Sequence, residues 1–398
     1  MTKIISDDIS AAVDIIAEGG LVAVPTETVY GLAANGLDAK AVERIYEVKG
    51  RPAIKPLSLM VPDKSAMERY CDCVPEAALE LADRFWPGPL TIVLKAKQLV
   101  PEIVRAGGDT VGLRCPDHPK TLQLLRALSL PLAAPSANPS DMPSPKNAQK
   151  VQEYFDGLIE GIIDGGECGI GTESTLLDMS RSPYRVLRQG ALPEAEITAQ
   201  LVASMTIVGI TGPTGCGKTT ALNVLAEHGA LILDCDKVYH ELLESDMQLL
   251  SELDEAFPGT VHDRVLDRKA LGAVVFTDKG ALEKLNKISH RHISGEINRR
   301  LSEWAMCGGR LAALDAIELI SSGISESCDV LIGVLADKET RARRIMARDG
   351  IDEEAAYLRI NAQRDDEYFK NNCTHVIYNN DTEENFRSSV NKLLTEVL

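Results

Sequence analysis

The sequence predicts an α/β protein made of two consecutive domains, residues 1–203 and 204–398. Three observations lead to this prediction. Short apolar runs alternate with helix-like segments along the chain, which is typical of α/β folds. A glycine-rich loop that follows a strand-like run and opens a helix begins near mid-chain, just after Met205. The length of 398 residues also exceeds that of an ordinary single domain.

Composition and charge limit the class of protein. Hydrophobic residues make up 44% of the chain and charged residues 25%, which is ordinary for a soluble globular protein. No apolar run reaches the ~18 residues of a membrane-spanning helix, and the N-terminus lacks the apolar stretch of a signal peptide. The net charge of −17 argues against strong direct nucleic-acid binding, although local cations can still hold nucleotides. The nine scattered cysteines indicate reduced thiols, so we expect a cytoplasmic protein.

The first half predicts a sheet of many strands with helices between them. The run 21–25 is continuously apolar, which is typical of a buried strand, and the segment 38–48 places Ala41, Ile45 and Val48 on one helix face. The same patterns predict strands at 57–61, 91–94, 110–114, 130–134, 158–163, 175–178 and 184–188, and helices at 76–85, 120–127, 147–155 and 194–204.

Polar side chains gather where these strands end, which is where α/β folds place their ligands. The clusters are 25–32, 49–52 with 55–57, 114–116, 134–138, 172–175 and 188–190. Each cluster by itself is at least as typical of a turn or a solvated loop. The ordered set is much more specific than any of its members.

The ordered set resembles the YrdC-like family of L-threonylcarbamoyl-AMP synthases over about residues 8–200. The matching segments are P-T-E-T-V-Y-G-L, K-G-R-P with K-P-L, W-P-G-P-L-T, G-L-R-C-P, S-A-N, G-x-x-S-T and L-R-Q-G. The resemblance implies a YrdC-like twisted α/β sheet domain. It also implies that this domain condenses L-threonine, bicarbonate and ATP into threonylcarbamoyl-AMP and pyrophosphate. The product would pass to the machinery that modifies adenosine 37 of tRNA.

The resemblance also implies roles for individual residues. On the substrate side these are Thr28, Tyr30, Arg114 and Ser174. Lys49 and Arg51 would hold the triphosphate as catalytic cations, and the nucleotide would meet Ser136, Asn138 and Arg188. Fixed cations and Mg²⁺ can stabilise the charge that develops on phosphoryl oxygens, without a covalent nucleophile.

The second half opens with a phosphate-binding pattern, G-x-x-x-x-G-K-[ST], between the strand-like run 206–210 and the helix-like run 220–226. Its glycines let backbone N–H groups turn inward around an anion, and the helix N-terminus adds a favourable dipole. Lys218 can reach the β- and γ-phosphates, and the Thr219 hydroxyl can ligate Mg²⁺. The nucleotide-binding residues expected from the pattern are Gly212, Gly215, Gly217, Lys218, Thr219 and Thr220.

The strand-like run 230–236 ends in two carboxylates, Asp234 and Asp236, which the strand period places on one side. In a nucleotide kinase one can deprotonate the acceptor hydroxyl while the other assists Mg²⁺ through water; the sequence leaves open which is the base. Further along, 251–276 predicts a mainly helical segment. Strands are expected at 311–315, 329–334 and 374–379, and helices at 338–348 and 383–397.

This half resembles dephospho-CoA kinase, a family that transfers the ATP γ-phosphate to the ribose 3′-hydroxyl of dephospho-CoA. The matching segments are the glycine loop, 234–236, 266–276, 285–290, 322–329, 337–349 and 375–380. The resemblance implies a P-loop kinase domain with a parallel sheet flanked by helices. Asp236 would be the general base, Asp234 would lie on the substrate side, and Arg344 and Arg348 would be lid arginines.

The chain departs from that family at three positions. The family usually has a proline after the histidine at 290, where this chain has Arg291. It usually has Asp-x-Pro-Leu-Leu-x-Glu, where this chain has Ile317 for the proline and Ser321 for the glutamate. The phosphate-binding parts are intact.

The leading prediction is therefore a bifunctional enzyme that uses Mg²⁺ with ATP, and L-threonine, bicarbonate and dephospho-CoA as substrates. The departures motivate an alternative, in which the first half is an active synthase and the second half is a nucleotide-binding regulator without kinase turnover. A third hypothesis makes the first half an RNA-binding module, against which the overall acidity argues.

Overall fold

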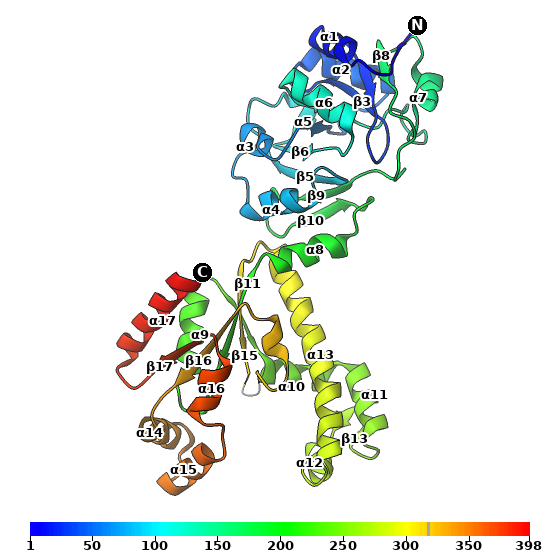
Figure 1. The fold of residues 1–398 in the computed structure, drawn as a ribbon. Coiled ribbons are helices and arrows are strands. Elements are labelled where there is room, and N and C mark those ends of the chain that lie inside the picture. The colour runs from blue at the N-terminus through cyan, green and yellow to red at the C-terminus, as the bar shows by residue number, and fades with distance from the viewer. Residues whose placement is uncertain (317–318) are drawn as a thin grey trace. The chain divides into compact units, whose positions relative to one another are not determined.

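The computed structural model describes residues 1–316 and 319–398, and the chain divides into two compact units (Figure 1). Unit 1 is Met1–Ser204 with Met306–Gly308, and unit 2 is Met205–Ala305 with Gly309–Leu398. Each unit has its own sheet with helices packed on it, which confirms the predicted fold class. Ile317, one of the three family departures, lies outside the described residues.

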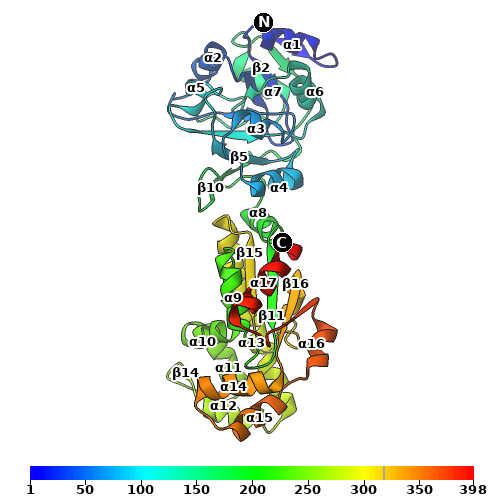
Figure 2. The ribbon, with the colours of Figure 1, turned by 90° about the vertical axis from the view of Figure 1, so that its left-hand side faces the viewer.

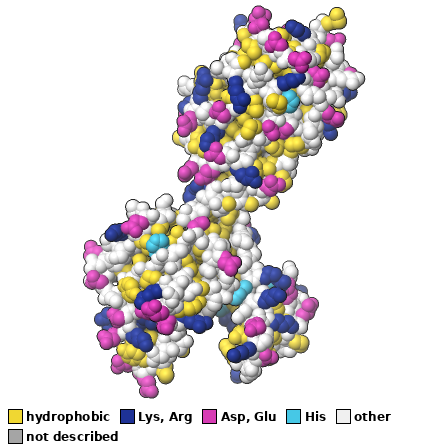
Figure 3. Space-filling view, in the orientation of Figure 1, with side chains coloured by type: hydrophobic (Ala, Val, Ile, Leu, Met, Phe, Trp, Pro, Cys, Tyr) yellow, Lys and Arg dark blue, Asp and Glu magenta, His cyan; other side chains and the backbone are white. Residues whose placement is uncertain are grey.

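Among the described helices, none has the length and apolar character needed to cross a membrane. Basic and acidic side chains are interspersed over the visible face of each unit (Figure 3).

Unit 1 is built on a ten-stranded sheet that mixes parallel and antiparallel pairs. In spatial order the strands are β1 (Lys3–Ile5), β8 (Gly161–Ile163), β2 (Val22–Val24), β3 (Gly31–Asn35), β7 (Leu132–Ala133), β4 (Ser58–Met60), β6 (Thr110–Arg114), β5 (Leu90–Lys95), β9 (Thr175–Asp178) and β10 (Arg185–Arg188). The helices are α1 (Ser10–Ala17), α2 (Ala39–Lys49), α3 (Ala66–Tyr70), α4 (Glu76–Phe85), α5 (Glu102–Arg105), α6 (Pro119–Leu128), α7 (Ala148–Phe155) and α8 (Glu194–Ala203). One core cluster joins α1 and α6 to β2, β3 and β7.

Element ends in unit 1 position the cations. α2 begins after Asp38, whose carboxylate caps it by accepting a hydrogen bond from Lys40 N at 2.9 Å. It ends at Gly50, whose φ of 60° is in the left-handed region that closes helices. Lys49 therefore lies in the last turn of α2, and Arg51 follows the turn. Arg114 and Arg188 are the final residues of β6 and β10.

Unit 2 is built on a five-stranded sheet whose pairs are all parallel. In spatial order its strands are β12 (Leu231–Asp234), β15 (Leu311–Asp315), β11 (Thr206–Thr211), β16 (Val330–Leu335) and β17 (His375–Tyr378). Its helices are α9 (Lys218–Glu227), α10 (Cys235–Ser245), α11 (Met247–Ala256), α12 (Arg268–Val275), α13 (Lys279–Met306), the short η1 (Ile324–Ser327), α14 (Lys338–Asp349), α15 (Glu353–Asn361), α16 (Asp366–Asn372) and α17 (Glu383–Val397). Figure 2 faces α9 and α17, which pack together on the sheet over Val208, Ile332 and Val334.

The prediction that Asp234 and Asp236 project from one side of a strand is wrong. β12 ends at Asp234, and α10 begins at Cys235, so Asp236 lies in the first turn of that helix. The Asp234 carboxylate accepts a hydrogen bond from Lys237 N at 3.0 Å. Aspartate is among the best N-cap residues, and capping here ends the strand two residues before the apolar pattern suggests.

The prediction of a mainly helical segment at 251–276 is confirmed at its two ends, in α11 and α12, and is wrong between them. A hairpin of β13 (Val261–His262) and β14 (Val265–Leu266) separates α11 from α12. Asp263 and Arg264 form its turn with φ of 49° and 66°, a conformation that a helix cannot contain.

Helix α13 is 28 residues long and runs without interruption through position 291, where the family resemblance leads one to expect a proline. Arg291 keeps the backbone N–H that a helix interior needs, and its side chain pairs with Glu252. A proline there would remove the donor and clash with the preceding turn. The departure from the family pattern is therefore consistent with a continuous helix.

We predict that Arg291→Pro lowers the free energy of unfolding of unit 2 by about 3 kcal/mol or more, the usual cost of proline in a helix interior. Urea titration followed by far-ultraviolet circular dichroism measures it. Arg291→Ala is the control, since it keeps the helix and loses an ion pair whose arginine side chain is 63% exposed, at a cost of about 1 kcal/mol or less. Equal stability of the two variants would contradict a continuous helix.

Candidate active sites

A cavity of about 180 Å³ lies among the strand ends of unit 1. Three arginines and one carboxylate, Glu173, are among its lining residues. The sequence-predicted residues that line it are Tyr30, Arg51, Arg114, Ser136, Ser174 and Arg188. Residues from separate segments of the chain thus meet at one place.

Backbone carbonyls hold two of the arginines. Arg188 Nη2 donates to Ser174 O at 2.8 Å, and Arg51 Nη2 donates to Pro56 O at 3.1 Å. Burial lowers the pKa of each guanidinium, and the charge of Arg188 adds to the effect on Arg51. Neither forms an ion pair with an acid in the described part of the chain. This side of the cavity therefore suits a highly charged anion.

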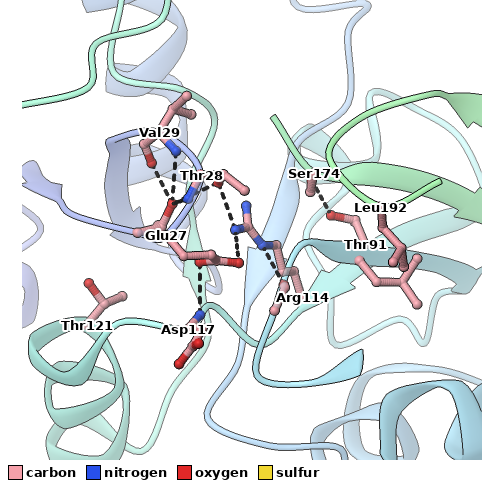
Figure 4. A network of polar contacts seen from close by, with 12 residues as sticks. Glu27, Thr28, Val29, Thr91, Arg114, Asp117, Thr121, Ser174 and Leu192 are labelled. Carbon is pink, nitrogen blue, oxygen red and sulfur yellow. Dashed lines mark hydrogen bonds and ion pairs between the residues drawn. The ribbon is translucent and has the colours of Figure 1, made fainter. Parts of the chain in front are cut away.

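The third arginine is held by an acid and a hydroxyl (Figure 4). Arg114 Nη2 donates to Glu27 Oε1 at 2.7 Å and to Thr28 Oγ1 at 2.8 Å. Arg114 Nε donates to Gly88 O at 3.2 Å. The other carboxylate oxygen, Glu27 Oε2, accepts from Asp117 N at 2.9 Å. Arg114 is thus fixed from several directions at the cavity wall.

Thr28 and Tyr30 occupy different places. Thr28 is fully buried and is not part of the cavity lining. Its hydroxyl accepts from Arg114 Nη2 and lies 2.8 Å from Thr26 Oγ1. Tyr30 does line the cavity, although its hydroxyl donates to Gly166 O at 2.9 Å and accepts from Gly165 N at 3.0 Å. Burial raises the pKa of Tyr30 to about 12, so the phenol stays protonated.

Lys49 and Asn138 shape the loop after β7 and are not among the residues lining the cavity. Lys49 is 3% exposed, and its Nζ donates to the carbonyl oxygens of Ser136 and Asn138. Burial, and then the charge of Arg51, lowers the pKa of Lys49 to about 7. The Asn138 side chain donates to Met142 O at 2.6 Å. These contacts fix the loop that carries Ser136 to the cavity.

In unit 2 the glycine loop wraps between β11 and α9. Gly212, Gly215 and Gly217 have φ of 146°, 83° and 100°. A Cβ on Gly212 would lie 2.2 Å from Val334 O, so the loop needs glycine for close approach as well as for conformation. Lys218 Nζ donates to Gly212 O at 3.1 Å across the loop. Thr219 and Thr220 lie in the first turn of α9.

Two arginines of α14 contact this loop. Arg344 Nη1 donates to Asn379 O at 3.0 Å and to Gly215 O at 3.4 Å. Arg341 Nε donates to Thr214 O at 3.0 Å. The other predicted lid arginine, Arg348, pairs instead with Asp349 at 2.7 Å, and its side chain is 61% exposed. The structure therefore brings Arg344 to the loop but not Arg348.

Asp315 is a carboxylate of this site that sequence reasoning did not select. It ends β15 and is paired in register with Ile210 of β11 and Asp234 of β12. Burial raises the pKa of Asp315 to about 6; Lys218 opposes this shift, and Asp234 and Asp236 add to it. Its Oδ1 is buried and has no hydrogen-bond partner among the described residues.

These groups fit a Mg²⁺ ion that arrives with ATP. An unsatisfied buried carboxylate oxygen on Asp315 and the Thr219 hydroxyl are oxygen donors, which Mg²⁺ prefers. Among the described residues, no group of three or more His, Cys, Asp or Glu side chains could hold a metal by itself. Phosphate oxygens and waters would therefore supply most of the ligands.

Other functional residues were missed because their contacts span the sequence. Gln363 Oε1 accepts from Thr214 N at 3.0 Å and from Arg341 Nη2 at 2.8 Å. Glu27 and Glu173 lie inside polar clusters that the sequence does mark. Each directly precedes a predicted site residue, Thr28 or Ser174, so the sequence could have predicted both as site residues. For Gln363 no local signal exists.

We predict that Asp315→Asn changes how the stability of unit 2 depends on pH. Because the folded-state pKa of about 6 exceeds the ordinary 3.8, Asp315 stabilises the fold below 3.8 and loses that contribution as the pH rises through 6. The wild type should therefore lose on the order of 2–3 kcal/mol relative to the variant over this window. Urea unfolding at a series of pH values measures it; parallel curves for the two proteins would refute the assignment.

Comparisons with known proteins match each half separately. A model of the Sua5, YciO and YrdC family, described as telomere recombination, matches residues 14–190, and a dephospho-CoA kinase model matches residues 206–385. Threonylcarbamoyl-AMP synthase of Pyrococcus abyssi is 51% identical over 189 residues, covering 48% of this chain and 56% of that protein, so the chain spans little more than half of it. A Methanocaldococcus jannaschii relative, whose name also refers to threonylcarbamoyl-AMP synthase, is 37% identical over 45% of this chain and 83% of its own length. Dephospho-CoA kinase of Corynebacterium efficiens is 33% identical over 48% of this chain and 96% of its own length.

Proposed function

The first half of this chain belongs to the Sua5–YciO–YrdC family and the second half to the dephospho-CoA kinase family, and on this premise we propose that the chain is a bifunctional enzyme. Unit 1 condenses L-threonine, bicarbonate and ATP to L-threonylcarbamoyl-AMP and pyrophosphate. Unit 2 phosphorylates the 3′-hydroxyl of dephospho-CoA with ATP. The observation that supports the proposal most is that each unit has its own polyphosphate-binding device, an arginine-lined cavity and a glycine loop.

In unit 1 the chain's own residues provide fixed positive charge and no covalent nucleophile. The threonine amine and bicarbonate combine to a carbamate with loss of water. A carbamate oxygen then attacks the α-phosphorus of ATP, the bond to the bridging oxygen breaks, and pyrophosphate leaves. Arg51 and Arg188 face the growing charge on the phosphate oxygens, already held in place by carbonyls. The product then passes to the proteins that transfer threonylcarbamoyl to tRNA.

In unit 2 the loop N–H groups and Lys218 hold the β- and γ-phosphates. Thr219 and Asp315 are the residues that would hold Mg²⁺, which would neutralise part of the phosphate charge. Asp236, in the first turn of α10, accepts the proton of the acceptor hydroxyl, and Asp234 keeps that turn in place as its cap.

We predict that the two reactions fail independently. Lys218→Ala should lower dephospho-CoA phosphorylation by on the order of 10²–10³-fold, the usual cost of a fixed donor to a developing charge, and leave threonine-dependent pyrophosphate release unchanged. Arg51→Ala is the reciprocal variant and should do the opposite. Each assay uses the purified full chain. Loss of both activities in either variant would contradict separate sites.

Absence of threonine-dependent pyrophosphate release from a folded wild type would refute the first half of the proposal. If ATP binds unit 2 by calorimetry but no phosphate reaches dephospho-CoA, unit 2 is a nucleotide-binding regulator instead. The departures at Arg291 and Ser321 make this outcome the one to test first.

We also predict which carboxylate is the base. Asp236→Asn should lower kcat for CoA formation by about 10²–10⁴-fold, the contribution of a general base. Asp234→Asn removes the same charge, but asparagine caps helices as well as aspartate does, so it should cost far less. Stopped or continuous assays at saturating substrate measure kcat. A larger loss in Asp234→Asn would reverse the assignment.

A further inference from the structure

We propose that Glu27 is a positioning residue of unit 1, which fixes Arg114 so that its remaining guanidinium nitrogen, Nη1, binds the carboxylate of the amino-acid substrate. The inference rests on the proposed synthase function. The family resemblance already puts Arg114 on the substrate side, and Arg51 and Arg188 with the nucleotide; the new element is the role of Glu27.

Glu27 bridges Arg114 and the Asp117 backbone, with one carboxylate oxygen to each. One carboxylate oxygen accepts from Arg114 Nη2 at 2.7 Å, and the other accepts from Asp117 N at 2.9 Å (Figure 4). Both side chains are largely buried, with 13% exposure for Glu27 and 8% for Arg114. Backbone contacts anchor Glu27 itself, because Ile170 N donates to Glu27 O at 2.9 Å. A buried carboxylate with a hydrogen bond to each oxygen has little freedom to rotate, so it fixes the orientation of the Arg114 guanidinium.

The contacts leave one guanidinium nitrogen of Arg114, Nη1, available. Nε is used by Gly88 O, and Nη2 is used by Glu27 and Thr28. Nη1 makes no hydrogen bond within the described residues, and Arg114 lines the cavity. A guanidinium held in this way keeps the N–H donors of one nitrogen, Nη1, for a single hydrogen bond to a carboxylate oxygen.

Charge decides which substrate meets which arginine. Glu27 compensates the charge of Arg114, whereas carbonyl oxygens hold Arg51 and Arg188 without cancelling theirs. Burial lowers the pKa of Arg188; the nearby Glu173 opposes that shift, but no ion pair joins the two in the described part of the chain. A polyphosphate carries several negative charges, so it is attracted most strongly by the two arginines that no acid pairs with, Arg51 and Arg188. A compensated arginine still gives directional hydrogen bonds to a single carboxylate.

Two substitutions test the proposal. Glu27→Asp keeps the charge but is one methylene too short for both contacts. Glu27→Gln keeps the length but has one acceptor oxygen, so its amide would face either Arg114 or the Asp117 N–H. The matched control is Glu160→Gln in the same unit. Glu160 makes the same pair of contacts, with Arg44 Nη2 at 2.7 Å and Leu21 N at 2.7 Å, but is not among the residues lining the cavity.

Calorimetry measures binding of L-threonine and of a non-hydrolysable ATP analogue to the full chain carrying Lys218→Ala, so that the analogue reports unit 1. We expect both Glu27 variants to weaken threonine binding about tenfold or more, with analogue binding changed less than about twofold and Glu160→Gln without effect. Retained analogue binding shows that the variants fold. The proposal would be overturned if threonine affinity were unchanged, or if the binding of both ligands were weakened equally. It would also be overturned if the parent chain did not bind threonine.

A second arm tests whether Glu27 acts through Arg114. Adding Glu27→Gln to Arg114→Lys should weaken threonine binding by less than about twofold beyond the single Arg114→Lys change, because residues that act as one unit are not additive. Full additivity would overturn the positioning role. If both ligands bind as expected but no pyrophosphate is released, the proposed synthase activity fails while the role of Glu27 stands.

Discussion

The two proposed reactions require each unit to concentrate positive charge around a phosphate anion and to keep that charge from moving. Both units meet this constraint with backbone carbonyls: Ser174 O holds Arg188 at 2.8 Å, and Gly212 O holds Lys218 at 3.1 Å. Carbonyl dipoles fix the position of a cation without cancelling its charge, so little reorganisation is needed when an anion arrives. Arg114 differs, because Glu27 compensates it. The unit 1 cavity is therefore lined by two kinds of cation, one held by an acid and two held by carbonyl oxygens.

Local patterns in the sequence were enough to predict the fold class and the glycine loop. A strand, a loop of glycines and a helix depend on neighbours only, and the apolar runs of β2 and β11 are continuous. Local patterns failed where a competing interaction decides the boundary. The Asp234 cap ends β12 early, and two residues with positive φ, Asp263 and Arg264, divide 251–276. Strands as short as β7, with two residues, also carry too little periodicity for their ends to be predicted.

The candidate sites were predicted to the extent that they lie at strand ends. Tyr30, Arg114 and Ser174 meet in one cavity because the sheet brings those strand ends together. The sequence could not separate residues that face the cavity from those that support it, as Lys49 does from the end of α2. That distinction depends on side-chain direction and on partners more than eighty residues away, such as the Asn138 carbonyl.

The two candidate sites are built in unrelated ways, one from arginines around a cavity and one from a glycine loop, and the proposal of two independent reactions follows from that difference. The most direct test is the stoichiometry with which the full chain binds a non-hydrolysable ATP analogue. The account predicts two sites per chain, of which Lys218→Ala removes one and Arg51→Ala the other. A single site in the wild type, or loss of both sites in either variant, would contradict it.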